Sequence, residues 1–152
     1  MSINTVEELI DWSRNMHGQL ATCLAQSSKA HKDERAGALL DYLASHERKL
    51  ETMVAGFEQH ADPRALHTWV YDFLSHKPIK TPYSCDGHYA QLDFEQICRE
   101  VFDVHHQVMD LYRDLTARVD IPEAKELLRS LLEMEEHEVM RLSQQVGRMG
   151  DL

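Results

Sequence analysis

One stretch decides the fold of this chain: residues 94–119, which read FEQICREVFDVHHQVMDLYRDLTARV. Side chains suited to a buried stripe recur there at alternating steps of four and three residues, as on the inward face of an amphipathic helix. The stripe consists of Phe94, Cys98, Val101, His105, Val108, Tyr112, Leu115 and Val119. His105 is its one strongly polar member. The stretch therefore predicts a long helix, over about residues 92–118, with a polar side chain near the middle of its inward face.

The same periodicity predicts three further long helices, over about residues 4–28, 32–60 and 122–147. Residues that commonly cap helix N-termini precede the four predicted helices: Asn4 or Thr5, Asp33, Asp93 and Asp120. Signals that end helices are Asp62-Pro63 after the second helix and Gly147 in the fourth.

Residues 61–91 form the connection between the second and third predicted helices. Their first part, residues 63–76, is compatible with a short helix, and residues 77–87 contain the Pro and Gly of a loop. No strand is expected anywhere. The predicted fold is a single all-α domain over residues 1–152, a four-helix bundle of two antiparallel hairpins joined by this long crossover.

Composition narrows the class of protein. The 152 residues contain 16 Lys and Arg against 26 Asp and Glu, a net charge of −10, which disfavours binding to nucleic acid or to an anionic membrane. No apolar run is long enough for a membrane span, and the first residues do not read as a signal peptide. Three Cys, an odd number, do not predict a disulfide framework, so the expected location is the reducing cytoplasm.

Each predicted helix carries one strongly polar residue on its inward stripe, close to its midpoint. Midpoints of equal antiparallel helices share one level, so these side chains are expected to converge in one layer. They are His17, His46, His105 and Glu135. Their sequence neighbours Glu47, His106 and Glu136 can lean into the same layer, and either His105 or its neighbour can be the one that faces the interior.

A bound cation would explain such a layer, because an unpaired buried charge costs several kcal/mol. Imidazole and carboxylate suit Zn, Fe or Mn. The candidate metal ligands are His17, His46, Glu47, His105, His106, Glu135 and Glu136. The alternative is a metal-free interaction or scaffold module, in which His and Glu satisfy each other by hydrogen bonds and fix how the helices pair.

Two segments resemble the ferritin-like superfamily in its rubrerythrin-like branch. That family places a Glu on the first and third helices and E-x-x-H on the second and fourth, where they hold two metal ions. Residues 44–50, ASHERKL, are similar to the second-helix motif, and residues 133–139, EMEEHEV, to the fourth, with Glu47 and Glu136 at the Glu positions. The resemblance implies a transition metal, iron ahead of manganese or zinc, and redox chemistry or metal handling.

The chain departs from this family at the other ligand positions. Leu50 and Val139 stand where the family has His, while His17 and His105 or His106 stand where it has Glu. A weaker resemblance is to hemerythrin-like bundles, through the spacing of the inward His residues and the H-x-x-x-x-D run at residues 105–110. Leu50 occupies the position of that family's acidic ligand, so the ferritin-like reading ranks first.

The remaining chemistry-bearing residues have simpler interpretations. CDGH at residues 85–88 reads as loop, since no second pair of zinc ligands is near, and Cys23 and Cys98 read as packed core thiols. The aromatic residues of the crossover are expected either to cover the bundle or to meet a second subunit, and a homodimer is the expected assembly. These residues are Trp69, Tyr71, Phe73 and Tyr83.

Overall fold

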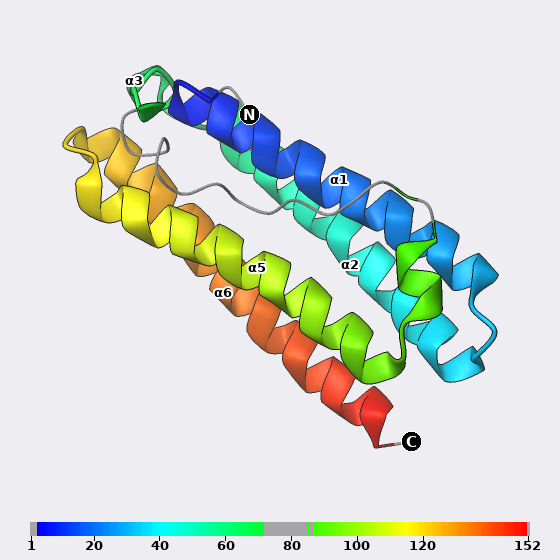
Figure 1. Ribbon diagram of the computed structural model, residues 1–152. Helices are drawn as coiled ribbons and strands as arrows, with labels where there is room; N and C mark the ends of the chain where they lie inside the picture. Colours follow the sequence, from blue (N-terminus) through cyan, green and yellow to red (C-terminus); the bar gives the residue numbers. More distant parts are fainter. Residues whose placement is uncertain (1–2, 72–84, 86, 152) are drawn as a thin grey trace.

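The computed structural model describes residues 3–71, 85 and 87–151, and these confirm the all-helical prediction. Four long helices lie side by side in Figure 1: α1 (Val6–Ala30), α2 (Glu34–Gln59), α5 (Phe94–Arg118) and α6 (Pro122–Gly150). Two short elements, α3 (Pro63–Leu66) and the 3-10 turn η1 (His88–Gln91), belong to the connection between α2 and α5. Within the described part of the chain no strand occurs, and Thr5 and Trp69 form one isolated β-bridge.

Three of the predicted N-terminal caps are confirmed. The side chain of Thr5 accepts a hydrogen bond from the backbone N–H of Glu8, and that of Asp33 accepts one from the N–H of Ala36. Asp93 forms a reciprocal capping box, in which its carboxylate accepts from the Gln96 backbone while the Gln96 side chain accepts from the Asp93 backbone. These contacts satisfy N–H groups that a helix start leaves without partners.

Two predictions about α6 are wrong. Asp120 does not cap it: the capping position is Ile121, which makes no side-chain cap, and Pro122 fills the first turn without an N–H that needs a partner. Gly147 does not end the helix, which continues to Gly150. Arg35 of α2 donates a hydrogen bond to the carbonyl oxygen of Gly150, so a tertiary contact holds the last turn beyond the glycine.

The buried stripes match the predicted ones on α1 and differ in part on α2. Alternating steps of four and three from Val6 predict six inward positions on α1, and all are buried: Val6, Ile10, Ser13, His17, Leu20 and Leu24. On α2 the same steps from Leu39 predict that Met53 and Phe57 face the core, but both are half-buried and Val54 is buried in their place. A straight helix has 3.6 residues per turn, so its buried face drifts away from a strict 3.5-residue repeat.

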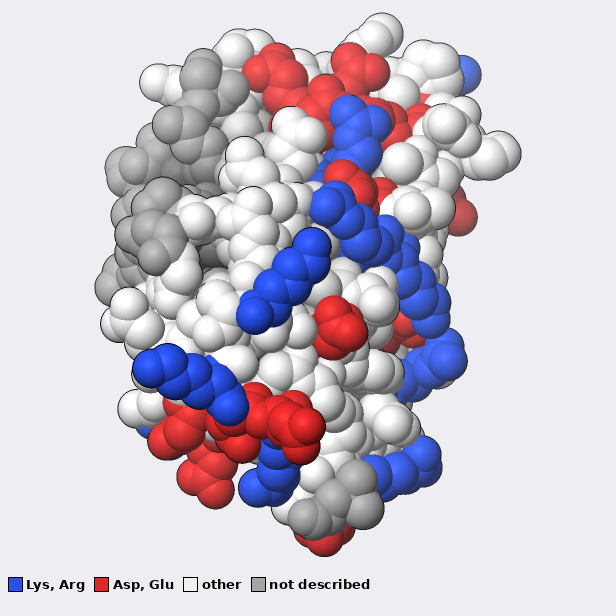
Figure 2. Space-filling view, turned by 90° about the vertical axis from the view of Figure 1, so that its right-hand side faces the viewer, with Lys and Arg blue, Asp and Glu red and all other residues white. Residues whose placement is uncertain are grey.

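On the face shown in Figure 2, Lys and Arg side chains stand among Asp and Glu side chains, with uncharged residues between them. The net charge of −10 is therefore not gathered there into one acidic patch. Among the described residues, no helix is long and apolar enough to cross a membrane.

The crossover aromatics were predicted to cover the bundle or to meet a second subunit. Trp69 is 56% exposed and Tyr71 is 50% exposed, with ring centroids 6.0 Å apart, so neither side chain is buried against the helices. Phe73 and Tyr83 lie outside the described residues, as does most of the loop predicted over residues 77–87.

A disulfide joins Cys23 of α1 to Cys85, and this corrects the prediction for both residues. Cys23 is not a packed free thiol, and Cys85 is more than a loop residue. Their pairing depends on where Cys85 lies against α1, which helical periodicity does not encode. The cytoplasmic location was predicted from the odd number of cysteines. Disulfides are typical of oxidising compartments, so this bond removes that argument. Cys98, on α5, is free and half-buried.

Replacing Cys23 by Ser is expected to lower the free energy of unfolding under oxidising conditions. The bond closes a loop between residues 62 positions apart, and the chain-entropy model gives about 4 kcal/mol for a loop of that size. Chemical denaturation with and without reductant measures the loss. Cys98→Ser is the control and is expected to cost less than about 1 kcal/mol. Equal stability of the wild type and Cys23→Ser without reductant would contradict a stabilising bond.

Candidate metal centre

The four long helices each contribute one fully buried ionisable side chain to a compact cluster. The four residues are His17 of α1, Glu47 of α2, His105 of α5 and Glu135 of α6, all with 0% exposure. We call these four residues the His–Glu ring. Burial at this level follows from the helical period, since each residue lies on the same stripe as the leucines and valines above and below it.

Hydrogen bonds close the ring around both carboxylates. His17 donates from Nδ1 to Glu47 Oε1 at 2.8 Å and from Nε2 to Glu135 Oε1 at 2.7 Å. His105 donates from Nε2 to Glu47 Oε2 at 2.7 Å and from Nδ1 to Glu135 Oε2 at 3.4 Å. An ionised carboxylate only accepts hydrogen bonds, so both nitrogens of each imidazole carry a proton in this arrangement. The ring thus pairs two imidazolium cations with two carboxylate anions.

The pKa values of the ring residues follow from this pairing. Burial alone would lower the pKa of each imidazole, but the two carboxylates outweigh it and raise the pKa of His17 to about 9 and that of His105 to about 10. Burial alone would raise the carboxyl pKa values. The two imidazolium groups instead hold the pKa of Glu135 at about 2 and that of Glu47 well below its usual range. The ring is therefore ionised but neutral overall near pH 7.

The donor set suits a transition-metal ion. One ligand atom from each of His17, Glu47 and His105 can be chosen so that all lie within 4.8 Å of one another. Glu135 bonds to both imidazoles and adds a second carboxylate. Two imidazole nitrogens with carboxylate oxygens form a ligand set for zinc, iron or manganese. Any such ion must replace imidazole protons, because only the neutral ring nitrogen is a ligand.

A buried hydroxyl pair lies one helical turn from the ring. The Tyr112 Oη and Ser13 Oγ atoms are 2.6 Å apart, and both side chains are fully buried. Burial raises the pKa of the Tyr112 hydroxyl, and the charge of Glu135 raises it further. Tyr112 therefore stays a protonated phenol that packs and hydrogen-bonds beside the ring.

His46 and Glu138 lie beside the ring, toward α6. His46 is 8% exposed, with Nδ1 3.8 Å from Glu47 Oε2 and Nε2 3.8 Å from Glu138 Oε1. Neither distance is a hydrogen bond, and among the described residues neither ring nitrogen has a partner. Glu138 is 1% exposed, and its carboxylate lies 2.7 Å from Lys49 Nζ and 3.3 Å from an Arg141 nitrogen. Despite the opposing effect of burial, these cations lower the pKa of Glu138.

The structure brings five of the seven predicted ligands together and leaves two outside. His17, Glu47, His105 and Glu135 form the ring, and His46 adjoins it. His106 and Glu136 are exposed, so His105 is the residue of helix α5 that faces the interior, and Glu135 rather than Glu136 faces it from α6.

Glu138 is the residue that sequence reasoning missed. The resemblance to E-x-x-H motifs was aligned on Glu136, which placed Val139 at the second ligand position. With Glu135 facing inward, the residue three positions later is Glu138, also buried. The signal was available in the helical phase, because Leu128 and Leu131 on one side and Leu142 on the other fix the buried stripe of α6 through 135 and 138.

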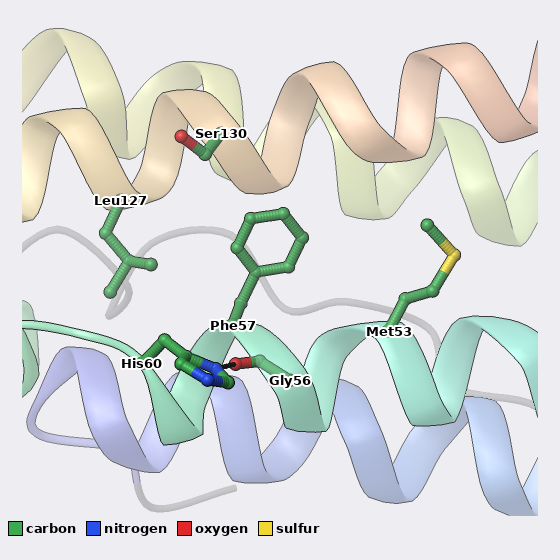
Figure 3. Close-up of a pocket in the computed structure, with 6 residues that line it drawn as sticks. All are labelled: Met53, Gly56, Phe57, His60, Leu127 and Ser130. Carbon is green, nitrogen blue, oxygen red and sulfur yellow. Dashed lines mark hydrogen bonds between the residues drawn. The ribbon is translucent and has the colours of Figure 1, made fainter.

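A largely apolar hollow of about 410 Å³ opens between α2 and α6, away from the ring (Figure 3). His60 donates from Nδ1 to the carbonyl oxygen of Gly56 at 2.9 Å, so this imidazole caps the C-terminal end of α2. None of the ring residues lines the hollow. Its lining residues are Met53, Gly56, Phe57, His60, Leu127 and Ser130.

Comparison with protein families, curated proteins and solved structures gives no match for this chain. The function is therefore inferred from the geometry and chemistry of the ring.

The metal-free protein is expected to lose stability as the pH rises above neutrality. The imidazole pKa values lie above the ordinary 6.5, so their contribution is complete below about pH 6.5 and is lost through about pH 9 to 10. The lowered carboxyl pKa values act oppositely, since their contribution is complete above about pH 4.5 and lost toward about pH 2. Urea unfolding in chelator, from pH 2 to pH 10, measures both effects.

The matched variants for this test are His105→Gln and His106→Gln. We expect the first to flatten the alkaline decline, because His105 takes part in the ring, and the second to leave the decline unchanged, because His106 is exposed. A free energy of unfolding that stays constant or rises between pH 7 and pH 10 would contradict the ionised ring.

Proposed function

We propose that the chain is a ferritin-like four-helix bundle that binds a divalent transition-metal ion at the His–Glu ring. The observation that carries the proposal is the ring itself, in which four helices present two imidazoles and two carboxylates at 0% exposure. The colours of Figure 1 support the topology, since the chain reverses direction between α1 and α2 and again between α5 and α6. The long connection between α2 and α5 corresponds to the crossover of such bundles.

Charge balance favours a single divalent ion in the ring. Two imidazolium cations and two carboxylates sum to zero in the metal-free ring. Removing one proton from each of His17 and His105 leaves two negative charges, which one divalent cation neutralises. The exchange therefore leaves no uncompensated charge in the fully buried site. An uncompensated charge is what makes the loss of one partner of a buried ion pair costly.

Each ring residue has a defined part in holding such an ion. His17 and His105 would supply imidazole nitrogens, and Glu47 and Glu135, each bonded to both imidazoles, would supply carboxylate oxygens from opposite sides. Iron comes first among the candidate metals, followed by manganese and zinc, on the resemblance of residues 44–50 and 133–139 to ferritin-like motifs. Iron or manganese would supply redox chemistry, and the surrounding apolar core would exclude water from it.

A metal-free scaffold is the second candidate, and the closed hydrogen bonding of the ring favours it. Every ring nitrogen and every carboxylate oxygen of the four residues has a partner. Such a satisfied polar layer can set which helices pair and in which register. The metal-binding protein and the metal-free scaffold have the same ring geometry. They differ in whether a metal ion replaces protons on the imidazoles of the ring.

Bound metal per chain is the deciding measurement. Elemental analysis of untagged protein, grown with iron, manganese and zinc and purified without chelator, is expected to give about one equivalent of metal. His105→Gln and Glu135→Gln remove one ring ligand each and are expected to lose it. Their neighbours supply the matched controls: His106→Gln and Glu136→Gln change exposed residues and are expected to keep it.

Negligible metal in the wild type, with no uptake on adding Fe(II) or Zn(II), would contradict the proposal and leave the scaffold candidate. Loss of metal in the exposed variants as well would place the site elsewhere. Circular dichroism of each variant separates lost metal from lost fold.

A further inference from the structure

A series of ligand-type side chains runs from the buried ring toward the molecular surface, where two exposed cations cover its outer end. Glu47 belongs to the ring, and its Oε2 lies 3.8 Å from His46 Nδ1. The other imidazole nitrogen lies 3.8 Å from Glu138 Oε1. Glu138 in turn contacts Lys49 and Arg141, whose side chains are 45% and 60% exposed. Glu47, His46 and Glu138 each offer carboxylate oxygen or imidazole nitrogen, the atoms that a transition-metal ion requires, whereas Lys49 and Arg141 are cations that cover the outer end of the series.

His46 is the unusual member of the series. It is more than nine-tenths buried, lies between two carboxylates and has no hydrogen bond at either ring nitrogen among the described residues. An unpaired buried polar group costs stability, so its retention calls for a use. A cation held between His46 and one of these carboxylates would give the imidazole the partner that it lacks.

We infer that His46 and Glu138 form an entry site, which takes a divalent metal ion from solution and passes it to the His–Glu ring. The inference rests on the proposed metal-binding function and deepens it. Glu138, which lies between α2 and α6 beneath the exposed Lys49 and Arg141, receives the ion, and His46 relays it to Glu47, which already belongs to the ring. The ring centroids of His46 and His105 are only 6.1 Å apart, so the relay ends within reach of a ring ligand.

Lys49 and Arg141 suit a site of transit better than a site of permanent occupation. Both carboxylate oxygens of Glu138 are engaged by these two side chains, at 2.7 Å and 3.3 Å. An arriving cation must displace Lys49, and the lysine re-forms its ion pair once the ion has moved inward. A second resident cation would instead have to stay close to two positive side chains, which repel it.

The opposite side of α2 supplies a matched control pair. Arg48 follows the same pattern as Lys49: it is 54% exposed and pairs with a glutamate, Glu51, at 3.3 Å. Glu51 lies against Gly18 of α1 rather than toward α6. Changes to Arg48 and Glu51 therefore alter net charge by the same amount as changes to Lys49 and Glu138, without touching the entry series.

The test is the rate of Co(II) uptake by chelator-stripped protein, followed by stopped-flow absorption, with the final stoichiometry measured in the same samples. Glu138→Gln is expected to slow uptake about tenfold and to leave the final stoichiometry unchanged, while Glu51→Gln alters neither. Lys49→Gln is expected to speed uptake several-fold, because it frees the Glu138 carboxylate, while Arg48→Gln leaves the rate near that of the wild type. A folding defect would slow Co(II) uptake. The faster uptake expected for Lys49→Gln therefore cannot result from such a defect.

Four results would overturn the inference. Equal rates in Glu138→Gln and Glu51→Gln would remove the entry site but leave the ring as the metal site. A lowered final stoichiometry in Glu138→Gln would make Glu138 a permanent ligand instead of a transit residue. If Lys49→Gln and Arg48→Gln speed uptake by the same factor, the change in rate comes from the net charge of the protein, which attracts the cation in general, and not from the entry site. A wild type that takes up no Co(II), nor Fe(II) or Zn(II), would remove the proposed function and the entry site together.

Discussion

The hydrogen-bonded ring of two imidazolium and two carboxylate groups is the constraint on which the rest of the structure depends. Each of the four long helices contributes one member, and each member is completely buried. Rotation of any one helix by a single residue would leave the other three with an unpaired buried charge, which costs about 3–5 kcal/mol. The ring therefore fixes the phase and level of all four helices, a degree of specificity that interchangeable leucines do not supply.

The sequence predicts the helices and the level of the polar layer because both depend on local repetition. Apolar residues at steps of three and four define the stripes, and capping residues such as Thr5, Asp33 and Asp93 define three of the starts. The choice between neighbours is harder. His105 and His106, or Glu135 and Glu136, differ by about 100° around the helix axis. The periodic stripe selects His105 and Glu135, which are the buried residues, whereas the resemblance to E-x-x-H motifs selects Glu136.

The features that sequence reasoning missed arise from contacts between distant segments. The Cys23–Cys85 bond depends on where Cys85 lies against α1, and the extension of α6 to Gly150 depends on Arg35 of α2. The helical phase of α6 already buries Glu138, but its ion pair with Lys49 of α2 is a contact between two helices. No period within one helix carries this information, because each contact requires the relative placement of two helices.

His46 separates the two explanations of the polar layer. A ring that only sets helix register is complete with His17, Glu47, His105 and Glu135, since each of their ligating atoms already has a partner. His46 adds no hydrogen bond to that register: among the described residues its two nitrogens lie 3.8 Å from Glu47 and Glu138 without a hydrogen-bond partner, yet burying it costs free energy. A scaffold would be more stable with leucine at this position. A protein that must load an ion into a fully buried ring needs ligands on the way in, and an unpartnered imidazole between Glu47 and Glu138 meets that need.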